Sequence, residues 1–441
     1  PDPYRALQRF ELLIQDFRAL SEAGQMNQLL SSPNILQDLA RLLGASDFLW
    51  EDFLRLQYEQ VVPMLSSDRR GSTLSLKRGE IAGALDRALA GESSSDDRRR
   101  ILNEFKDHHA YLIDVDHILA RDTDFFFLSR RLTALAEAVV NAAVHLAWEE
   151  ITPQYGVPRT VAGIEASHAV MGLGKMGGEA LGYASDIELL FLYSDSGQTD
   201  GHRSVSNTEF FEELFQRSVR IIRARREGIF QLDLRLRPHG KAGPLAVSTA
   251  SFLQYYRSDA SSLEKLALVR MRWIGGDAEL GHRIERVRDE LIYGADSIDL
   301  PELQRLRAIQ LQEKADHGRL NAKFSPGGLV DLEYSVQILQ VTMGRQNPAL
   351  RTPRIHEALS ALVTAGEIDQ EESERLVGAY RFLRQLINGL RMLRGNAQDL
   401  FLPAEGSLEF MHLARRAGYS GRGKLSPAEE LRVEFETRTA E

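Results

Sequence analysis

The 441-residue chain contains no cysteine. This absence excludes a disulfide framework, cysteine-based zinc sites and a thiol nucleophile, and it agrees with a reducing compartment. Basic residues are also in the minority, because 54 Lys and Arg stand against 63 Asp and Glu, which gives a formal net charge of −9. An acidic balance argues against a general nucleic-acid coat, whose affinity comes from neutralising phosphates, although it leaves room for one small basic pocket.

Long apolar runs without charge are missing as well. The most apolar helical stretch, 132–148, carries Glu137, Asn141 and His145, which indicates a buried helix and not a membrane span. The opening sequence PDPYRALQRF has neither the basic start nor the apolar centre of a signal peptide. We therefore expect a cytoplasmic protein that has neither a membrane nor a nucleic acid as its partner.

Hydrophobic periodicity divides the chain into three regions. Residues 1–155 show Leu and Phe at spacings of three and four, which predicts an N-terminal helical region. Residues 156–280 lose this helical periodicity and contain short β-rich runs. Residues 281–441 return to helical periodicity, which predicts a C-terminal bundle. The predicted strands are 167–171, 187–193 and 229–236, with helices at 129–150 and 208–225. The predicted fold is therefore α+β and predominantly helical, with a small mixed β-sheet core flanked by two helical regions.

One group of polar residues in the N-terminal region could suggest a metal site. Its members are His108, His109, His117, Asp107, Asp114 and Asp116. Apolar residues at helical spacing, such as Phe105, Leu112 and Val115, lie among them. This pattern favours the polar face of an ordinary helix.

The most informative stretch is 172–193, which reads GLGKMGGEALGYASDIELLFLY. Gly172, Gly174 and Gly177 satisfy the G-x-G-x-x-G pattern of dinucleotide-binding folds. That fold also needs a helix of several turns after the glycines, and only 178–185 separates them from the next predicted strand. The dinucleotide interpretation also leaves Asp186 and Glu188 without a role, so we favour one that uses them.

Asp186 and Glu188 share one face of the predicted strand, because alternate residues of a strand point the same way. Two carboxylates beside a glycine turn predict a magnesium site, with phosphates next to backbone N–H groups that glycine leaves accessible. Asp233 is the candidate third carboxylate, and Arg235 and Arg237 share its face in the alternating run QLDLRLRP. An acid and two arginines on one face could bind metal ions and phosphate oxygens. The alternative interpretation of this run is a solvated edge strand with an ordinary polar face.

These motifs together resemble the glutamine synthetase adenylyltransferase family, whose catalytic module is a nucleotidyltransferase of the polymerase-β-like superfamily. The resemblance rests on GLGKMGG at 172–178, SDIEL at 185–189, DLRLRP at 233–238 and GGLVDLEY at 327–334. It continues through 252–272 and covers most of the chain. Several separated motifs in the family's order are far more specific than any one of them.

The resemblance implies an enzyme that attaches AMP from ATP to a tyrosine of glutamine synthetase, or removes it by phosphorolysis with release of ADP. Typical members carry two such modules, and this chain holds one. The direction stays open, because the opening residues resemble the removing half, whereas Val330-Asp331 and the ending resemble the transferring half. Glutamine synthetase would be the protein substrate, and a small nitrogen-signalling protein would be a regulatory partner.

The residues and the resemblance together give a candidate site that would bind two Mg²⁺ ions and ATP or ADP. The expected catalytic and metal-binding residues are Asp186, Glu188 and Asp233. The expected nucleotide-binding residues are Gly172, Gly174, Lys175, Gly177, Gly178, Ser185, Arg235 and Arg237. A supporting layer is expected at Lys323, Asp331 and Glu333. Helix capping is the alternative role for the two acids, and a solvent-facing side chain is the alternative for Lys175.

The chain departs from the family pattern at two positions of this site. It has Glu188 where the family usually has Asp, and Ala180, preceded by Glu179, where the family usually has Glu. The extra methylene of Glu188 moves its carboxylate by about 1.5 Å, a displacement that can cost around a hundredfold in rate. The alternative function is therefore a weak or inactive relative that binds nucleotide or glutamine synthetase without turnover.

Overall fold

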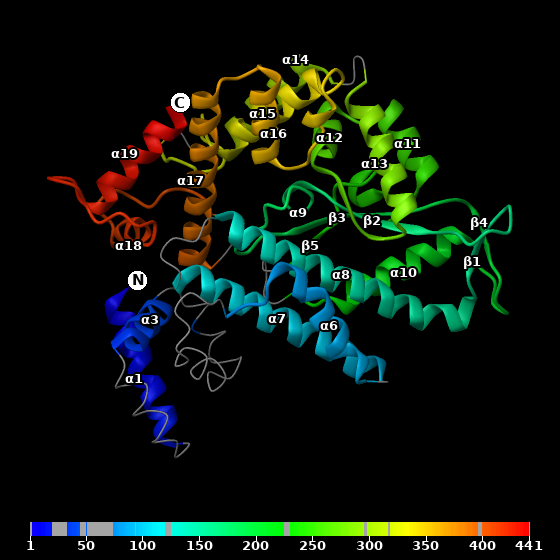
Figure 1. Cartoon of the computed structure of the whole chain (residues 1–441), viewed down its shortest axis with the longest axis horizontal. Coiled ribbons are helices and arrows are strands. Elements are labelled where there is room, and N and C mark those ends of the chain that lie inside the picture. The colour runs from blue at the N-terminus through cyan, green and yellow to red at the C-terminus, as the bar shows by residue number, and fades with distance from the viewer. Residues whose placement is uncertain are drawn as a thin grey trace.

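The computed structural model describes most of the chain. The described residues are 2–19, 33–44, 50, 74–92, 94–119, 125–224, 230–294, 298–315, 318–395 and 399–440. They form a predominantly helical α+β fold around a small mixed sheet, as the sequence predicts (Figure 1). None of the described helices is long and apolar enough to cross a membrane.

The central sheet has five strands, and four of them follow the order β5-β3-β2-β7. Strand β3 pairs antiparallel with β2, parallel with β5 at its start and parallel with β6 at its end. The strands are β2 (His168–Gly172), β3 (Ile187–Tyr193), β5 (Leu232–Asp233), β6 (Ala246–Ser248) and β7 (Arg272–Gly276). A separate two-stranded sheet joins β1 (Pro158–Thr160) to β4 (Gly197–Thr199).

Strand β3 is buried on both faces, because its sequence IELLFLY is apolar at almost every position. Leu189, Phe191 and Tyr193 face a core that includes α8 (Phe125–Tyr155) and α10 (Asn207–Ile221). Leu190 and Leu192 instead face a second core, which includes α11 (Thr249–Ser258) and α13 (Ala278–Ile292). The sheet therefore lies between two helical layers (Figure 1).

The helices of the first 155 residues pack on one another and on the sheet. Those in the described part of the chain are α1 (Pro3–Ala19), α3 (Pro33–Leu43), α6 (Ile81–Ala90), α7 (Ser95–Leu119) and α8. Helix α8 begins before and ends after the predicted range 129–150, and it contains Pro153 in its last turn. Proline removes only one N–H there, and the N–H of Gly156 still donates to the carbonyl of Thr152 at 2.8 Å.

Helix α7 carries the group of histidines and acids that could suggest a metal site. Burial lowers the pKa of both His109 and His117 to about 4, so these rings are neutral near pH 7. Asp116 is buried and accepts hydrogen bonds from Leu74 N and Ser75 N. Within the part of the chain that the structure describes, no three His, Asp or Glu side chains are grouped to hold a metal ion.

The C-terminal helices form a bundle with its own core, which also takes in Phe125 and Phe126 from the start of α8. The helices that form this core are α15 (Leu329–Met343), α16 (Ile355–Ala365), α17 (Gln370–Arg394), α18 (Leu408–Arg416) and α19 (Pro427–Ala440). Helix α14 (Leu300–Lys314) instead packs through Leu303 on the core that includes α11 and α13. The boundaries near residues 155 and 280 remain a prediction, since one core runs from Ile81 in the N-terminal helices to Ile274 in the sheet.

Candidate active site

The glycine turn connects the end of β2 to a single helical turn, α9 (Gly174–Gly177). Gly174 has a φ of +48°, and a Cβ added there would lie 2.7 Å from Cδ of Glu188. A Cβ on Gly177 would overlap the carbonyl oxygen of Arg270, and one on Gly178 would lie 2.6 Å from Nε of Arg270. The missing side chains at these glycines therefore partly make room for the protein's own Glu188 and Arg270.

The three predicted acids occupy neighbouring backbone positions. Glu188 and Asp233 are direct partners in the parallel pairing of β3 with β5, and Asp186 immediately precedes β3. Ile187 is buried whereas Asp186 and Glu188 are partly exposed, which agrees with the two acids sharing the strand face opposite Ile187. The predicted strand at 229–236 is too long, because only Leu232 and Asp233 are paired and residue 229 lies outside the described residues.

The carboxylates of Glu188 and Asp233 each have a partner within the protein. Glu188 Oε2 accepts a hydrogen bond from the N–H of Lys175 at 2.6 Å. Asp233 accepts from Nε of Arg235 at 2.9 Å and from Nη2 at 2.6 Å. Burial raises the pKa of Asp233, but the hydrogen bonds from Arg235 outweigh burial and leave this pKa below its ordinary value. The backbone thus brings the acids together, but Glu188 and Asp233 turn to separate partners, and these three carboxylates of the described chain are not grouped to hold a metal ion as they stand.

Lys175 is partly buried within the glycine turn and is not a solvent-facing lysine. Burial lowers its pKa to about 8, although the nearby charges of Glu188 and Asp186 act in the opposite direction. Its ammonium group also lies within range of the charges of Arg391 and Lys323. Lys175 therefore stands between the acids of the sheet and a group of cations from the C-terminal half.

Two other predicted nucleotide-binding side chains are engaged by their own surroundings. Ser185 is buried, and its Oγ accepts from Gly182 N at 2.9 Å and from Nη1 of Arg391 at 3.3 Å. Arg237 folds back on its loop, where Nε and Nη2 each donate to the carbonyl of Gly243 at 3.2 Å. In this arrangement, only Arg235 of the two predicted arginines is bound to Asp233.

The predicted supporting residues divide into two roles. Asp331, in the first turn of α15, accepts from Gly327 N at 2.9 Å and from Nε of Arg307 at 2.6 Å, so it stabilises the helix start. Glu333 instead accepts from Nη1 of Arg270 at 2.9 Å and from Nη2 of Arg384 at 2.5 Å. Because Arg270 lies against Gly178, Glu333 connects the C-terminal bundle to the glycine turn.

Three buried arginines near the turn were missed by sequence reasoning, namely Arg270, Arg384 and Arg391. The sequence contains a pattern that indicates a buried role for two of them. Arg384 and Arg391 are seven residues apart on α17, and this spacing places them on the same side of the helix among buried apolar residues such as Leu383 and Leu390. An arginine repeated within an apolar helix face indicates a buried role.

The departure at Ala180 has a local explanation. Ala180 is buried, and Glu179 is the residue that forms ion pairs, with Nη2 of Arg78 at 2.6 Å and with Nη2 of Arg354 at 2.9 Å. Burial raises the pKa of Glu179, but its hydrogen bonds and ion pairs with Arg354 and Arg78 outweigh burial and lower this pKa to about 2. Glu179 thereby fastens the glycine turn to the N-terminal and C-terminal helical regions.

Glu179→Gln is expected to lower the free energy of unfolding by about 3 kcal/mol at pH 7. The pKa of Glu179 is lower in the folded state than its ordinary value of 4.5, so its stabilisation is complete above about pH 5 and is lost as the pH falls towards 2. Urea denaturation from pH 7 to pH 3 should show the gap between variant and wild type shrinking to less than half. The exposed Glu92→Gln is the control, and a gap that stays constant down to pH 3 would assign the effect to packing instead.

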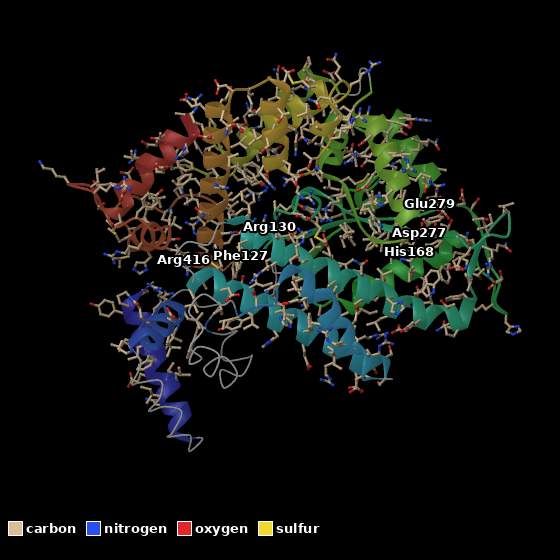
Figure 2. The ribbon with its side chains drawn as sticks, viewed as in Figure 1. Phe127, Arg130, His168, Asp277, Glu279 and Arg416 are labelled. Carbon is tan, nitrogen blue, oxygen red and sulfur yellow. The ribbon has the colours of Figure 1, made fainter. Side chains whose placement is uncertain are left out.

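A polar group at the opposite end of the sheet is separate from this site. Figure 2 shows His168, at the start of β2, near Asp277 and Glu279 of the α13 start. The N–H of Asp277 donates to the carbonyl of His168 at 2.8 Å, and the ring of His168 stacks on Trp148. Burial lowers the pKa of His168 to about 4, so it is a neutral, packed ring.

Comparison with known proteins gives the family. Residues 36–287 match the model of the glutamate-ammonia ligase adenylyltransferase family, and residues 302–441 match that of the GlnD PII-uridylyltransferase family. The first match covers more than half of the chain.

Among curated relatives, the chain is similar to proteins named bifunctional glutamine synthetase adenylyltransferase/adenylyl-removing enzyme. That of Xanthomonas oryzae pv. oryzae is 36% identical over 293 residues, which are 65% of this chain and 31% of the relative. That of Hahella chejuensis is 30% identical over 369 residues, which are 81% of this chain and 37% of the relative. The chain thus spans well under half the length of these relatives, and it belongs to the glutamate-ammonia ligase adenylyltransferase family.

Proposed function

We propose that this chain is a magnesium-dependent nucleotidyltransferase module that transfers AMP between a nucleotide and a tyrosine of glutamine synthetase. The observation that supports it most is the pairing of Glu188 with Asp233 across β3 and β5, with Asp186 on the same face. The names of the relatives support glutamine synthetase as the protein substrate. We further propose a cytoplasmic location, a nitrogen-signalling protein as regulator, and a core within residues 156–280.

The donor set of the site fits Mg²⁺, because it consists of carboxylate oxygens without thiolates or imidazoles. Asp186 and Glu188 would hold both ions, and Asp233 would complete the binding of one. When bound, the ions would clamp the attacking and leaving oxygens at the α-phosphorus. Asp233 must first release Arg235, whose side chain is 66% exposed. The Asp233 side chain is only 15% exposed, so the metal ions would have to replace the hydrogen bonds that Arg235 donates to it.

The chain's own residues would position the reacting groups. In adenylylation, the tyrosine oxygen bonds to the α-phosphorus of ATP as the bond to pyrophosphate breaks and the hydroxyl proton is released. In phosphorolysis, an oxygen of inorganic phosphate bonds to the same phosphorus, the bond to the tyrosine oxygen breaks, that oxygen takes up the proton released by the phosphate, and ADP leaves. Lys175, largely charged at pH 7, would offset phosphate charge, and Arg235, once released, would orient a phosphate or the protein substrate.

Two assays test this function. The full chain is incubated with labelled ATP, Mg²⁺ and unmodified glutamine synthetase, and separately with adenylylated glutamine synthetase and phosphate. We expect transfer above the enzyme-free blank in at least one direction. Retained binding of nucleotide or glutamine synthetase with no turnover in either assay would instead favour the docking relative that the Glu188 departure suggests.

Gly174→Ala is expected to lower kcat/KM by about a hundredfold, because the new methyl group would push the Glu188 carboxylate out of its position. The left-handed backbone at residue 174 adds a cost of about 1–2 kcal/mol. Gly163→Ala is the matched control, since Gly163 has a φ of +77° but a Cβ there meets nothing within 4 Å. Equal activity losses in the two variants would show that strain, and not Glu188, is responsible.

A further inference from the structure

Three arginine side chains near the candidate site are buried, and each has at least one N–H group without a partner among the described residues. Arg270, Arg384 and Arg391 are 4%, 5% and 7% exposed. In the part of the chain that the structure describes, Nε and Nη2 of Arg270, Nε of Arg384 and Nε of Arg391 donate to no acceptor. Buried guanidinium donors are ordinarily paired, so this group indicates a missing acceptor.

Contacts hold Arg270 against the turn and Arg391 against the residues before β3, whereas Arg384 joins the group through its ion pair with Glu333. The guanidinium of Arg270 occupies the space that a side chain at Gly178 would fill. Nη1 of Arg391 donates to the carbonyl of Tyr183 at 3.2 Å and to Oγ of Ser185 at 3.3 Å, directly before Asp186. The three side chains come from η3 (Leu268–Arg270) and α17, so the C-terminal bundle supplies two of them.

The charges of this region do not balance. Glu333 is a single carboxylate shared by Arg270 and Arg384, and Arg391 has no acidic hydrogen-bond partner among the described residues. Asp186 and Glu188 add two negative charges nearby, and Lys175 and Lys323 add two positive ones. Five cations thus face three carboxylates. The cations are Lys175, Arg270, Lys323, Arg384 and Arg391. A phosphate dianion would offset the two remaining positive charges.

We propose that Arg391, together with Arg270, Arg384 and Lys323, binds a phosphate group beside the glycine turn. Guanidinium groups present pairs of N–H donors that match two phosphate oxygens, and a water molecule would satisfy these donors less completely. The inference deepens the proposed function and rests on it for the source of the phosphate, either the polyphosphate chain of a nucleotide or free inorganic phosphate. Because the unpaired donors are closed to solvent, binding requires these side chains to move locally.

The test measures binding of two probes, inorganic phosphate and pyrophosphate, to the full chain by isothermal titration calorimetry with EDTA at constant ionic strength. We expect at least one probe to bind, and Arg391→Gln to weaken that binding by about tenfold to a hundredfold. Arg391→Lys should retain part of the affinity, because it keeps the charge but not the fork. Arg375→Gln, on the exposed side of α17, is the matched control and should bind as the wild type does.

Lys323→Met is the second variant, should Arg391→Gln fail to fold as judged by its melting temperature. Its expected loss is again about tenfold, since the Lys323 ammonium lies within range of Glu333 and Arg391. Binding of pyrophosphate alone would identify the nucleotide chain as the source, and binding of inorganic phosphate alone would identify free phosphate. Binding of neither probe, or affinities unchanged within twofold in folded variants, would overturn the proposal.

The outcome is separable from that of the proposed function, because the probes are bound without metal and without glutamine synthetase. Arg391-dependent phosphate binding in a chain that transfers no AMP would support the proposed phosphate site and contradict the proposed function. Transfer of AMP that persists in Arg391→Gln, with unchanged phosphate affinity, would contradict the proposed phosphate site and support the proposed function.

Discussion

Asp186→Asn is expected to lower the rate of AMP transfer by at least about a thousandfold, in whichever direction the chain works. The substitution keeps the shape of the side chain but removes the negative charge that would bind both metal ions, and metal ions contribute several kcal/mol to such reactions. Asp186 directly precedes β3, beside the paired positions of Glu188 and Asp233. Initial rates with labelled ATP, or with adenylylated substrate and phosphate, measure the effect.

Asp195→Asn is the matched control for this experiment. Asp195 follows the other end of β3 and is exposed, so the same chemical change there should leave the rate unaltered. Melting temperatures of the two variants separate catalysis from folding, because a partly exposed aspartate that is not needed for packing should change stability little. A rate for Asp186→Asn within tenfold of the wild type would show that Asp186 is not a metal ligand of the reaction.

Glu333→Gln is expected to lower the free energy of unfolding by about 3–5 kcal/mol, the largest stability effect that we expect from a single substitution here. The change leaves Arg270 and Arg384 buried without a counter-charge. Burial raises the pKa of Glu333, but Arg384, Arg270 and Lys323 outweigh it and lower this pKa overall. The stabilisation is therefore present above the ordinary carboxyl pKa and is lost on acidification.

Urea denaturation at pH 7, with Glu367→Gln as the exposed control, measures this effect. The double variant Glu333→Gln with Arg384→Met adds a second check. Removing one of the two orphaned guanidinium groups should restore part of the lost stability, so the two changes should not be additive. A loss below 1 kcal/mol in Glu333→Gln would show that the two arginines find other acceptors without Glu333.

The elements nearest the site were predictable because their signals are local. The run at 187–193 is apolar except for Glu188 and follows a glycine turn, and β3 occupies those residues. Strand alternation predicted that Asp186 and Glu188 share a face, and Asp233 was predicted because such a site needs a third carboxylate from another strand. Glu188 and Asp233 are paired in the parallel register of β3 with β5. Strand β5 is shorter than predicted because the alternating pattern at 229–236 continues after the chain leaves the sheet, where Arg237 instead bonds to its own loop.

The contacts that fasten the site to the rest of the molecule could not be predicted. Glu179 pairs with arginines 101 and 175 positions away, and Glu333 pairs with arginines 63 and 51 positions away. Periodicity describes neighbours along one helix or strand, so it carries no information on such partners. The family pattern indicated that Glu333 lies near the site, but the reason, its bond to Arg270 against Gly178, required the folded arrangement.

The direction of AMP transfer is a separate question from the family to which this chain belongs. The chain spans well under half the length of its curated relatives, which are named for two opposite activities. One site with three carboxylates serves either direction in our proposal, because the α-phosphorus is attacked in both. The choice between directions then lies in the nucleophile that the surroundings admit, and the phosphate site at Arg391 bears directly on it.

The most direct test is a titration of Mn²⁺, a paramagnetic substitute for Mg²⁺, into the full chain with a non-hydrolysable ATP analogue, followed by electron paramagnetic resonance. We expect two bound ions per wild-type chain, loss of one ion in Asp233→Asn, and loss of both in Asp186→Asn. The same number of bound ions, with the same affinity, in wild type and both variants would contradict a metal site formed by Asp186, Glu188 and Asp233.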